Sequence, residues 1–406
     1  MSYRIRTSCR LCGSPVLDTI LTLTPTPAAN EFVAADQAGL AQQEFPLYLS
    51  RCVACGHVQL PVVVSPDLLF SNYVYVSGTS PSFVRHFEEY SREMIERFSL
   101  QQGDLVVDIG SNDGTLLRFF QNAGMRVLGV DPARRIAEEA TASGVETLCA
   151  FFDRGTAAQI MVAHGAATLV LANNVFAHAD DLREIAAGVK DLIDPQRGYF
   201  VFEVQYLVDM VQKTLFDMVY HEHLSYHSIE PLIPFFDSLG MSIVDVKRVG
   251  THGGSIRVMV QPSVRVQASE RMTNFIADER VALSGEPYAA MFQRIERASQ
   301  ALHDALDQSK GKVVGYGAPA KLTTLMYQFG ISSEHIAYVV DDSPWKQGLL
   351  TPGRHIPVTS ADRLMQAGER PNCIVIFAWN FADQIISKYP QFKGSFIVPL
   401  PEFKKV

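Results

Sequence analysis

The chain has 406 residues, of which 47% are hydrophobic, and a formal net charge of −8. This length predicts two or three domains with substantial cores, and the acidic balance argues against a protein that coats nucleic acid. The sequence contains no run of eighteen apolar residues, and no apolar h-region follows its basic N-terminus. We therefore expect a cytoplasmic protein that neither spans a membrane nor carries a secretory signal.

Four of the six cysteines form two CxxC pairs, and each pair is followed directly by glycine. Cys9 and Cys12 lie in CRLCG, and Cys52 and Cys55 lie in CVACG. This spacing lets both sulfurs of a pair face one cation, and four thiolates complete the tetrahedral shell of zinc. We expect a structural zinc site, with disulfides and a redox or iron site as the alternatives.

The next predicted elements are a helix and the first strands of an α/β domain. Apolar residues recur at helical spacing from Phe83 onward, after a SGTSPS segment that supplies N-cap hydroxyls. Leu105 to Ile109 is a short apolar run typical of a buried parallel strand. The turn DIGSNDG and an amphipathic helix follow, and a second strand, RVLGVD, ends on Asp131. This order predicts a nucleoside site, with the Asp131 carboxylate on the ribose hydroxyls.

The glycine turn lacks the GxGxxG pattern of dinucleotide-binding folds. Asp113 lies where a pyrophosphate would need the helix N-terminus, and an acid there repels a pyrophosphate but suits a cationic ligand. S-adenosylmethionine carries an ammonium and a sulfonium group beside its ribose, so it fits better than NAD; a turn that binds no nucleotide is the alternative. The cofactor-binding candidates on this turn are Gly110, Asn112, Asp113 and Gly114.

Further strands bring candidate residues to the same edge of the predicted sheet. A third strand is expected to end near Phe151 or Phe152, which makes Phe152 a candidate neighbour of the adenine. A fourth strand, TLVLANN, ends with Asn173 and Asn174, and His178 follows it. These side chains are expected on the rim where the methyl donor meets its acceptor.

The stretch DMVYHEHLSYHS, residues 217–228, is unusually dense in titratable side chains. It follows a fifth predicted strand, GYFVFEVQ, and so lies on the same ligand-binding edge. The HExxH spacing of a helical zinc pair is absent. An imidazole beside a carboxylate is typical of a tuned base, so the stretch favours a proton-transfer site over a metal site or a solvated turn.

The last third of the chain repeats the order of strand, glycine turn and helix. The segment THGGSIR is expected either to reach a substrate through His252 or Arg257, or to form only a β-turn before a strand. A helical tract over 268–309 links the domains. GKVVGYGAPAK then opens a second Rossmann-like unit, but its turn carries Lys321 and a proline instead of GxGxxG, which weakens an NAD-binding interpretation.

Taken in order, the motifs CxxCG…CxxCG, YxYxSGTS, VDIGSNDGTLL, GVDP, ANNVFAH, YHEHLSYHS and GKVVGYGAPAK resemble those of the sugar C-methyltransferase family. The resemblance implies an α/β protein with a small zinc-binding module over 1–75, a class I methyltransferase (Rossmann-like) domain over 76–265, and linker helices with a Rossmann-like α/β domain over 266–406. It implies transfer of a methyl group from S-adenosylmethionine to C3 of a nucleotide-linked 4-keto-6-deoxyhexose. Methylation at C5 and a nicotinamide-dependent oxidoreductase are the alternatives.

The resemblance also implies roles for individual residues in this chemistry. Removal of the proton next to the C4 ketone gives an enolate, whose carbon attacks the sulfonium methyl group. His223 is the leading candidate for the base, with Glu222 and Tyr220 beside it. The remaining candidates are Tyr73 and Tyr75, which with Tyr220 are possible donors to the C4 oxygen; Asn174, His178 and His252, which contact the sugar; and Tyr316 and Lys321, which bind near the nucleotide.

Overall fold

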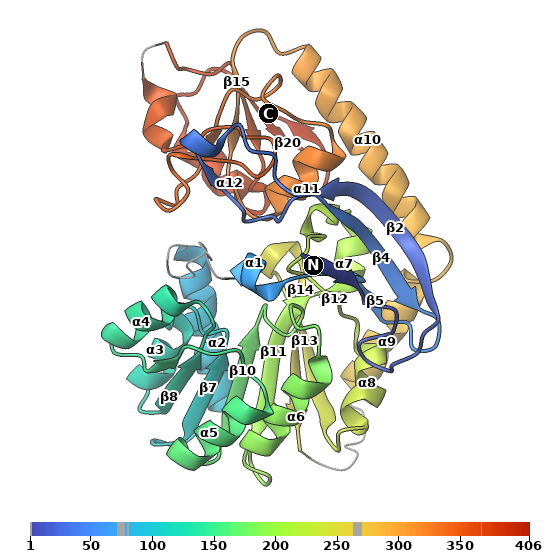
Figure 1. Ribbon diagram of the computed structural model, residues 1–406, viewed down its shortest axis with the longest axis vertical. Coiled ribbons are helices and arrows are strands. Elements are labelled where there is room, and N and C mark those ends of the chain that lie inside the picture. The colour runs from blue at the N-terminus through green and yellow to red at the C-terminus, as the bar shows by residue number, and fades with distance from the viewer. Residues whose placement is uncertain (1, 71–77, 79–80, 263–269, 367) are drawn as a thin grey trace.

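The computed structural model describes residues 2–406 except 71–77, 79–80, 263–269 and 367. A central sheet domain and a C-terminal sheet domain lie one above the other, and the N-terminal strands run along the side that joins them (Figure 1). Tyr73 and Tyr75 lie outside the described residues. In the described part of the chain, no helix is both long and apolar enough to cross a membrane.

The central domain contains a seven-stranded sheet in the order β13-β14-β11-β10-β7-β8-β9. All its neighbouring pairs are parallel except those that involve β14. Between β7 and β10 the order of strands reverses, which is where open α/β sheets bind ligands. The strands are β7 (Leu105–Ile109), β8 (Arg126–Val130), β9 (Thr147–Leu148), β10 (Leu169–Asn173), β11 (Tyr199–Gln205), β13 (Ser242–Val249) and β14 (Ser255–Gln261).

Helices cover both faces of this sheet, because each helix buries one apolar stripe against it. One face packs against α2 and α3, and the other packs against α5, α6 and α8. The helices of this domain are α2 (Pro81–Phe98), α3 (Thr115–Asn122), α4 (Arg134–Ala142), α5 (Arg154–His164), α6 (Leu182–Leu192), α7 (Leu207–Gln212) and α8 (Ile229–Asp237).

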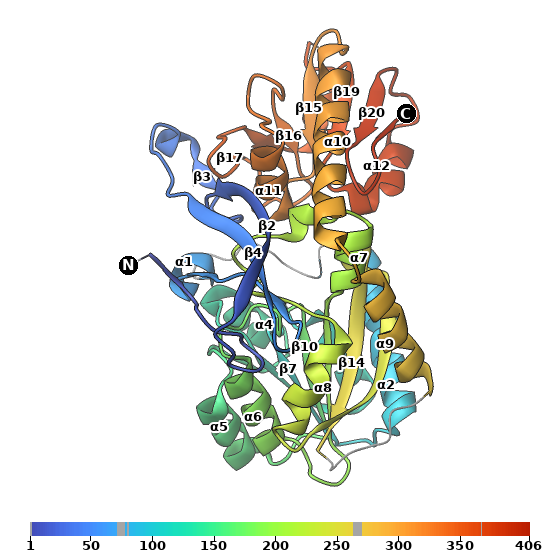
Figure 2. The same ribbon diagram turned by 90° about the vertical axis from the view of Figure 1, so that its right-hand side faces the viewer.

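The C-terminal domain contains a six-stranded sheet in the order β18-β16-β15-β19-β20-β21, parallel except for β21. Its strand order reverses between β15 and β19, so this sheet has a ligand-binding edge of its own. The long helix α10 runs beside it toward the central domain (Figure 2). The elements are α10 (Pro287–Asp307), β15 (Val313–Tyr316), α11 (Lys321–Gln328), β16 (Val339–Val340), β17 (Leu349–Leu350), β18 (Val358–Thr359), β19 (Cys373–Ile376), α12 (Ala382–Lys388), β20 (Ser395–Val398) and β21 (Lys404–Lys405).

The N-terminal module adds strands to both other domains. Its strands β2, β4 and β5 form a sheet with β12 (Ser225–Tyr226), which belongs to the histidine-rich stretch. Its short strand β3 pairs with β17 of the C-terminal domain. The elements are β1 (Tyr3–Ile5), β2 (Leu17–Thr26), β3 (Val33–Ala34), β4 (Phe45–Cys52), β5 (Val58–Gln59), β6 (Val62–Val64) and α1 (Pro66–Phe70). The module therefore links the two larger domains through backbone hydrogen bonds.

Two local features differ from the expectations. Strand β9 ends at Leu148, before the predicted Phe151 or Phe152, and Phe152 instead precedes α5. Helix α9 (Glu270–Ala282) packs on the central domain, because its Glu279 accepts hydrogen bonds from the backbone N–H groups that open α8. The first described helix after residue 266 thus packs against α8 of the central domain as well as leading to the C-terminal domain.

Candidate active site

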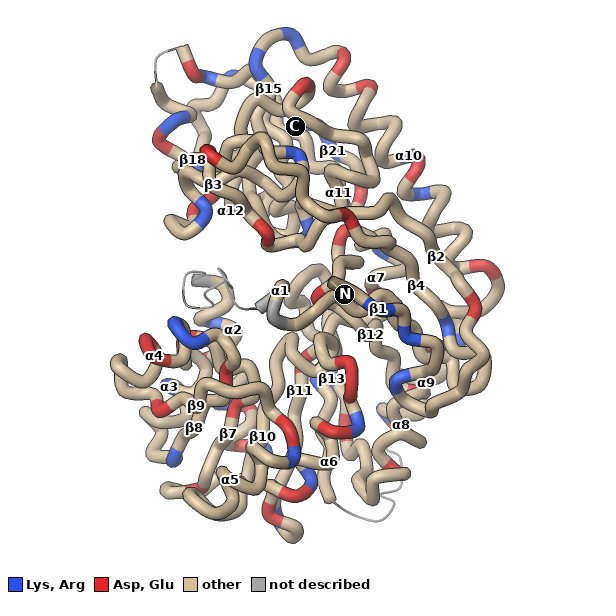
Figure 3. The backbone as a smooth tube through the Cα atoms, in the orientation of Figure 1, with Lys and Arg blue, Asp and Glu red and all other residues tan. Residues whose placement is uncertain are grey.

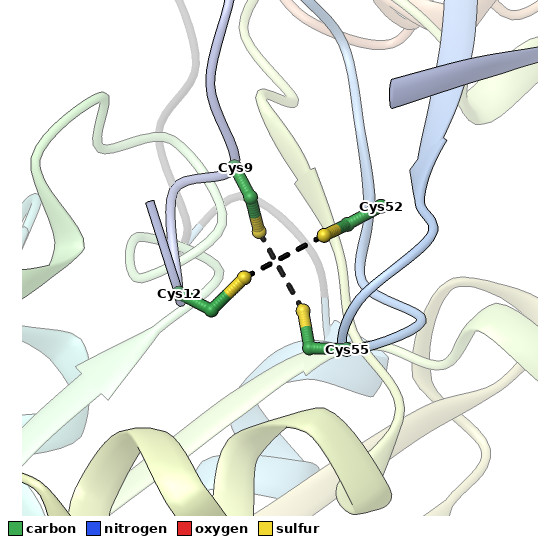
Figure 4. Close-up of side chains that lie close together, drawn as sticks. All are labelled: Cys9, Cys12, Cys52 and Cys55. Atoms are coloured by element: carbon green, nitrogen blue, oxygen red, sulfur yellow. Dashed lines mark hydrogen bonds between the residues drawn. The ribbon is translucent and has the colours of Figure 1, made fainter. Parts of the chain in front are cut away.

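The two CxxC turns bring their sulfurs together at one point. The side chains of Cys9, Cys12, Cys52 and Cys55 converge from two loops (Figure 4). Sulfur–sulfur distances are 3.6 Å between Cys9 and Cys55 and 3.5 Å between Cys12 and Cys52, and all four Sγ atoms lie within 4.8 Å of one another. A disulfide needs about 2 Å, whereas Zn–S bonds of about 2.3 Å place tetrahedral sulfurs about 3.8 Å apart. The arrangement fits zinc and leaves no ligand position for a substrate.

A single cavity of about 620 Å³ lies at the carboxyl ends of both large sheets. It is lined by residues that follow β7, β8 and β10 of the central domain, residues that follow β15, β16 and β19 of the C-terminal domain, and Asn30 of the N-terminal module. Gly114 is absent from its wall. The predicted site residues on the wall are Gly110, Asn112, Asp113, Asp131, Phe152, Asn173, Asn174, His178, Tyr220, Glu222, His223, His252, Tyr316 and Lys321.

The turn after β7 is shaped by tight backbone approach. Gly110 has φ of 69°, and a Cβ atom there would lie 2.2 Å from the side chain of Val175. Asn112 has φ of 50°, a conformation that asparagine tolerates better than most residues. Its N–H donates to Asp131 at 2.9 Å, and the N–H of Ala133 donates to the other carboxylate oxygen at 2.9 Å. Burial raises the pKa of Asp131, and these two hydrogen bonds oppose that rise.

The Asp113 carboxylate lines the cavity and also accepts hydrogen bonds from neighbouring parts of the chain. It accepts hydrogen bonds from the N–H of Gly78 at 2.9 Å and from the N–H and hydroxyl of Thr115 at 3.2 and 2.7 Å. The acid therefore holds the first turn of α3 and the chain that precedes α2. Its charge is partly compensated by these donors, so it repels an anion less than the sequence pattern alone suggests.

The wall of the central domain fits a donor with charged and hydroxyl groups. Several side chains on this wall contain buried polar atoms that lack a hydrogen-bond partner among the described residues: Asp108, Ser111, Asn173 and Gln205. Buried polar atoms are rarely left unpaired in proteins. The ammonium, carboxylate and ribose groups of S-adenosylmethionine would pair with such atoms, and the buried Phe152 ring offers an apolar surface for a base.

Two histidines and a tyrosine lie against one another on the cavity wall. The rings of His178 and His223 lie 5.0 Å apart, and the rings of Tyr220 and His223 lie 4.0 Å apart. The Nδ1 of His223 lies 2.8 Å from the carbonyl oxygen of Met218, so Nδ1 donates and Nε2 keeps its lone pair. Burial lowers the pKa of His223 to about 4 and that of His178 well below its ordinary value. Both imidazoles are therefore neutral at pH 7.

Glu222 points away from this stack toward the N-terminal module. Its Oε1 accepts a hydrogen bond of 2.7 Å from the side-chain amide of Asn30. Burial raises the pKa of Glu222 to about 7, and the hydrogen bond from Asn30 and the charge of Lys346 oppose the rise. Near neutral pH this carboxyl group exists in both protonation states, which suits a proton carrier.

The C-terminal domain contributes a buried lysine. The Nζ of Lys321 donates to Asn380 at 2.8 Å and lies 3.4 Å from the ring centre of Trp379. Burial lowers the pKa of Lys321 to about 8, and the charge of Asp217 opposes this. The indole N–H of Trp379 donates to Asp217 at 2.6 Å, and His252 of the central domain also lines the cavity. The lysine remains largely cationic at pH 7.

The glycine turn of the C-terminal domain is closed by an acid. The carboxylate of Asp341 accepts hydrogen bonds from the N–H groups of Ala318 and Ser343 at 2.6 and 2.9 Å. The hydroxyl of Tyr316 donates to Asp342 at 3.0 Å, and Asp342 also pairs with Lys388. Charged residues of both signs are interspersed along the described part of the backbone (Figure 3).

Several residues at the cavity were not predicted from the sequence. Asn30 and Lys346 reach Glu222 from positions more than a hundred residues away, and no local pattern marks them. Asn380 on the wall and its neighbour Trp379, which contacts Lys321 but does not line the cavity, follow the strand-like run CIVIF, and that position after a parallel strand was a usable signal. In contrast, His221 packs against Phe45 and donates to the carbonyl of Pro46 at 3.1 Å, outside the cavity wall. The buried Arg257 pairs with Glu203 and Glu93 and is also absent from the wall.

Family models match three consecutive parts of the chain. Residues 9–70 match a family described as "Putative zinc binding domain", residues 83–246 match "Methyltransferase domain", and residues 250–401 match "C-methyltransferase C-terminal domain". The C-methyltransferase NovU of Streptomyces niveus is 36% identical over 403 residues, which cover 97% of this chain and 95% of NovU.

Solved structures resemble a smaller part of the chain. The magnesium protoporphyrin IX methyltransferase of Synechocystis with bound S-adenosylmethionine is 15% identical, with a TM-score of 0.34, and the match covers 44% of this chain and 78% of that one. An S-adenosylmethionine-dependent methyltransferase of Clostridium acetobutylicum is 13% identical, with a TM-score of 0.35, over 44% of this chain and 92% of that one. The identity to NovU extends over nearly the whole chain, in agreement with the three family models and with the cysteine cluster. The chain belongs to the C-methyltransferase family, as an S-adenosylmethionine-dependent enzyme with a zinc-binding N-terminal domain.

Proposed function

We propose that the enzyme methylates C3 of a nucleotide-linked 4-keto-6-deoxyhexose, with C5 as the alternative ring position. The observation that carries the proposal is the neutral imidazole of His223, whose Nδ1 is bound to the Met218 carbonyl while Nε2 keeps its lone pair. A carbon next to a ketone becomes a nucleophile only after it loses a proton, so a neutral base inside the cavity is the group that such a reaction needs.

In this proposal His223 accepts the proton next to the C4 ketone. When bound, S-adenosylmethionine supplies an electrophilic methyl group. An imidazole with a pKa of about 4 is a weak base, so the negative charge that develops on the ketone oxygen has to be stabilised at the same time. The hydroxyl of Tyr220 is the candidate donor to that oxygen, and His178 and Asn174 orient the sugar beside it. Tyr73 and Tyr75 remain further candidates for the same donor role.

The C-terminal wall suits the nucleotide end of the acceptor. Lys321 carries a positive charge at pH 7, and Tyr316 lies on the same wall, so phosphate and sugar groups have a cation and a hydroxyl within the cavity. His252, with φ of 53°, is held on the opposite loop in a conformation uncommon for its residue type. Glu222 lines the same cavity, and its pKa of about 7 is near the working pH, so it is the second candidate for proton transfer.

Two measurements test the proposal separately. The first follows labelled methyl from S-adenosylmethionine into a panel of nucleotide 4-keto-6-deoxyhexoses, with the corresponding 4-hydroxy sugars as controls, and locates the new carbon by NMR. The second omits the donor and measures exchange of the sugar protons with D₂O. We expect exchange and methylation at the same carbon in the keto sugars, and neither in the 4-hydroxy sugars.

The matched variants are His223→Ala and His221→Ala. Both histidines are buried and lie two residues apart, but only His223 lines the cavity. His223→Ala is expected to lose about 10²–10⁴-fold in both the exchange and the methylation rate, whereas His221→Ala retains them. Methylation of a 4-hydroxy sugar, or full proton exchange by His223→Ala, would contradict the proposed chemistry.

A further inference from the structure

We propose that Arg10 is a positioning residue that couples the four-cysteine site to the two central histidines. Arg10 lies between Cys9 and Cys12, and its side chain is fully buried. Its Nη1 donates to the carbonyl of Leu60 at 2.9 Å and to the carbonyl of Leu224 at 3.1 Å. Its Nε donates to Asp180 at 3.1 Å, and Nη2 pairs with the same carboxylate oxygen at 3.0 Å.

These contacts reach both loops that carry the stacked imidazoles. Leu224 follows His223 directly, and Asp180 lies two residues after His178. The two loops are also joined to each other, because the N–H groups of Leu224 and Ser225 donate to the carbonyl of Ala177 at 2.9 and 3.0 Å. One guanidinium group therefore sets the spacing of the two loops, and through them the 5.0 Å spacing of the rings.

The CxxC turn that contains Arg10 also contacts the strand that pairs with β12. The backbone N–H of Arg10 donates to the side chain of Gln59 at 2.9 Å, and Gln59 in β5 pairs with Ser225 in β12. Both CxxC turns thus hold the strand that pairs with β12. A metal ion that fixes the four sulfurs also fixes the backbone of Arg10. The zinc-binding domain thereby positions residues at the reaction centre, although the metal itself lies outside it.

An arginine suits this position for a physical reason. A guanidinium group offers five N–H donors in a rigid fork, whereas a lysine ammonium donates from a single point on a flexible stem. A buried ion pair contributes little net stability compared with packed apolar residues, but it can specify one geometry. We expect the pair of Arg10 and Asp180 to order the two loops more than it stabilises the protein.

Only the expected change in kcat rests on the proposed role of His223; the expected changes in hydrogen exchange do not. The test compares the zinc-loaded wild type with Arg10→Lys, Arg10→Met and the control Arg6→Met. Arg6 also donates to Asp180, at 3.0 Å to its carbonyl, but does not contact Leu224. Four quantities are measured: zinc content, the dissociation constant of S-adenosylmethionine, hydrogen exchange at the amides of residues 224 and 225, and kcat with KM for the acceptor.

We expect both Arg10 variants to retain zinc and donor affinity. Relative to the wild type, hydrogen exchange should become faster at the amides of residues 224 and 225 and less so in the central sheet. We also expect kcat to fall about 10²-fold with little change in KM for the acceptor. Arg6→Met is expected to behave as the wild type. Hydrogen exchange reports on the loops even if the acceptor panel yields no methylation, so failure of the proposed function is distinguishable from failure of this inference. Unchanged protection at residues 224 and 225 in Arg10→Met, or a kcat loss that only follows loss of zinc in both variants, would overturn the role of Arg10.

Discussion

Replacement of Glu222 by glutamine is predicted to change how the stability of the enzyme depends on pH. Burial raises the pKa of Glu222 from 4.5 to about 7. The folded state therefore holds this proton more tightly than the unfolded state, so the unfolded state loses it first as the pH rises. Between pH 4.5 and 7 the folded state binds more protons, and this group lowers the free energy of unfolding progressively. Glutamine stays neutral and still offers an oxygen to Asn30.

The magnitude follows from the two pKa values. Each pKa unit corresponds to about 1.4 kcal/mol, so ionisation of Glu222 costs the folded state roughly 1 kcal/mol at pH 5 and about 3 kcal/mol at pH 8. The Glu222→Gln variant is thus expected to gain about 2–3 kcal/mol on the wild type between pH 5 and pH 8. The buried histidines titrate equally in both proteins, so their contribution cancels in this difference.

Urea unfolding of both proteins, followed by far-UV circular dichroism at pH 5, 6, 7 and 8, measures the change. Glu138→Gln in α4 serves as the control, because the Glu138 side chain is exposed. A difference between wild type and Glu222→Gln that stays constant over this pH range would refute the reasoning. It would mean that the carboxyl group ionises in the folded protein as it does in the unfolded chain.

Three further predictions concern the donor site, the metal site and the acceptor site. Gly110→Ala is expected to weaken S-adenosylmethionine binding at least tenfold in calorimetry, because its Cβ would lie 2.2 Å from a neighbouring valine side chain. Gly103→Ala, which has open space at the Cβ position, is the control, and equal donor affinities of the two variants would contradict this prediction. Cys55→Ser is expected to lower both zinc content by metal analysis and methyl transfer, whereas Cys149→Ser in the exposed thiol outside the cluster retains both; full activity without zinc would refute a structural role for the metal. Lys321→Met is expected to raise KM for the acceptor without changing donor affinity. The wild-type KM should also rise above pH 8, because the Lys321 ammonium, with a pKa of about 8, loses its proton there. A KM that stays constant to pH 9 would exclude a contact between this ammonium and the acceptor.

The sequence by itself was sufficient to predict the order of the main elements and the four-cysteine site. Both depend on contacts that are short along the chain. A run such as Leu105–Ile109 followed by a glycine turn specifies strand and loop locally, and the CxxC spacing brings two sulfurs to one side of a single turn. The local pattern failed where a strand was short, as at β9, because a two-residue strand is defined by its neighbour β8 rather than by its own residues.

Tertiary structure alone decided the environment of each buried titratable group. His221 and His223 share the same local sequence, yet one packs against Phe45 and the other lines the cavity. Glu222 obtains its amide partner from Asn30, 192 residues away, and this contact exists only because β12 joins the N-terminal sheet. The pKa values and the spacing of the imidazoles follow from desolvation and from such distant contacts, which have no periodicity along the chain. The sequence therefore identifies which chemical groups are available, and the packing of three domains around one cavity determines which of them face one another.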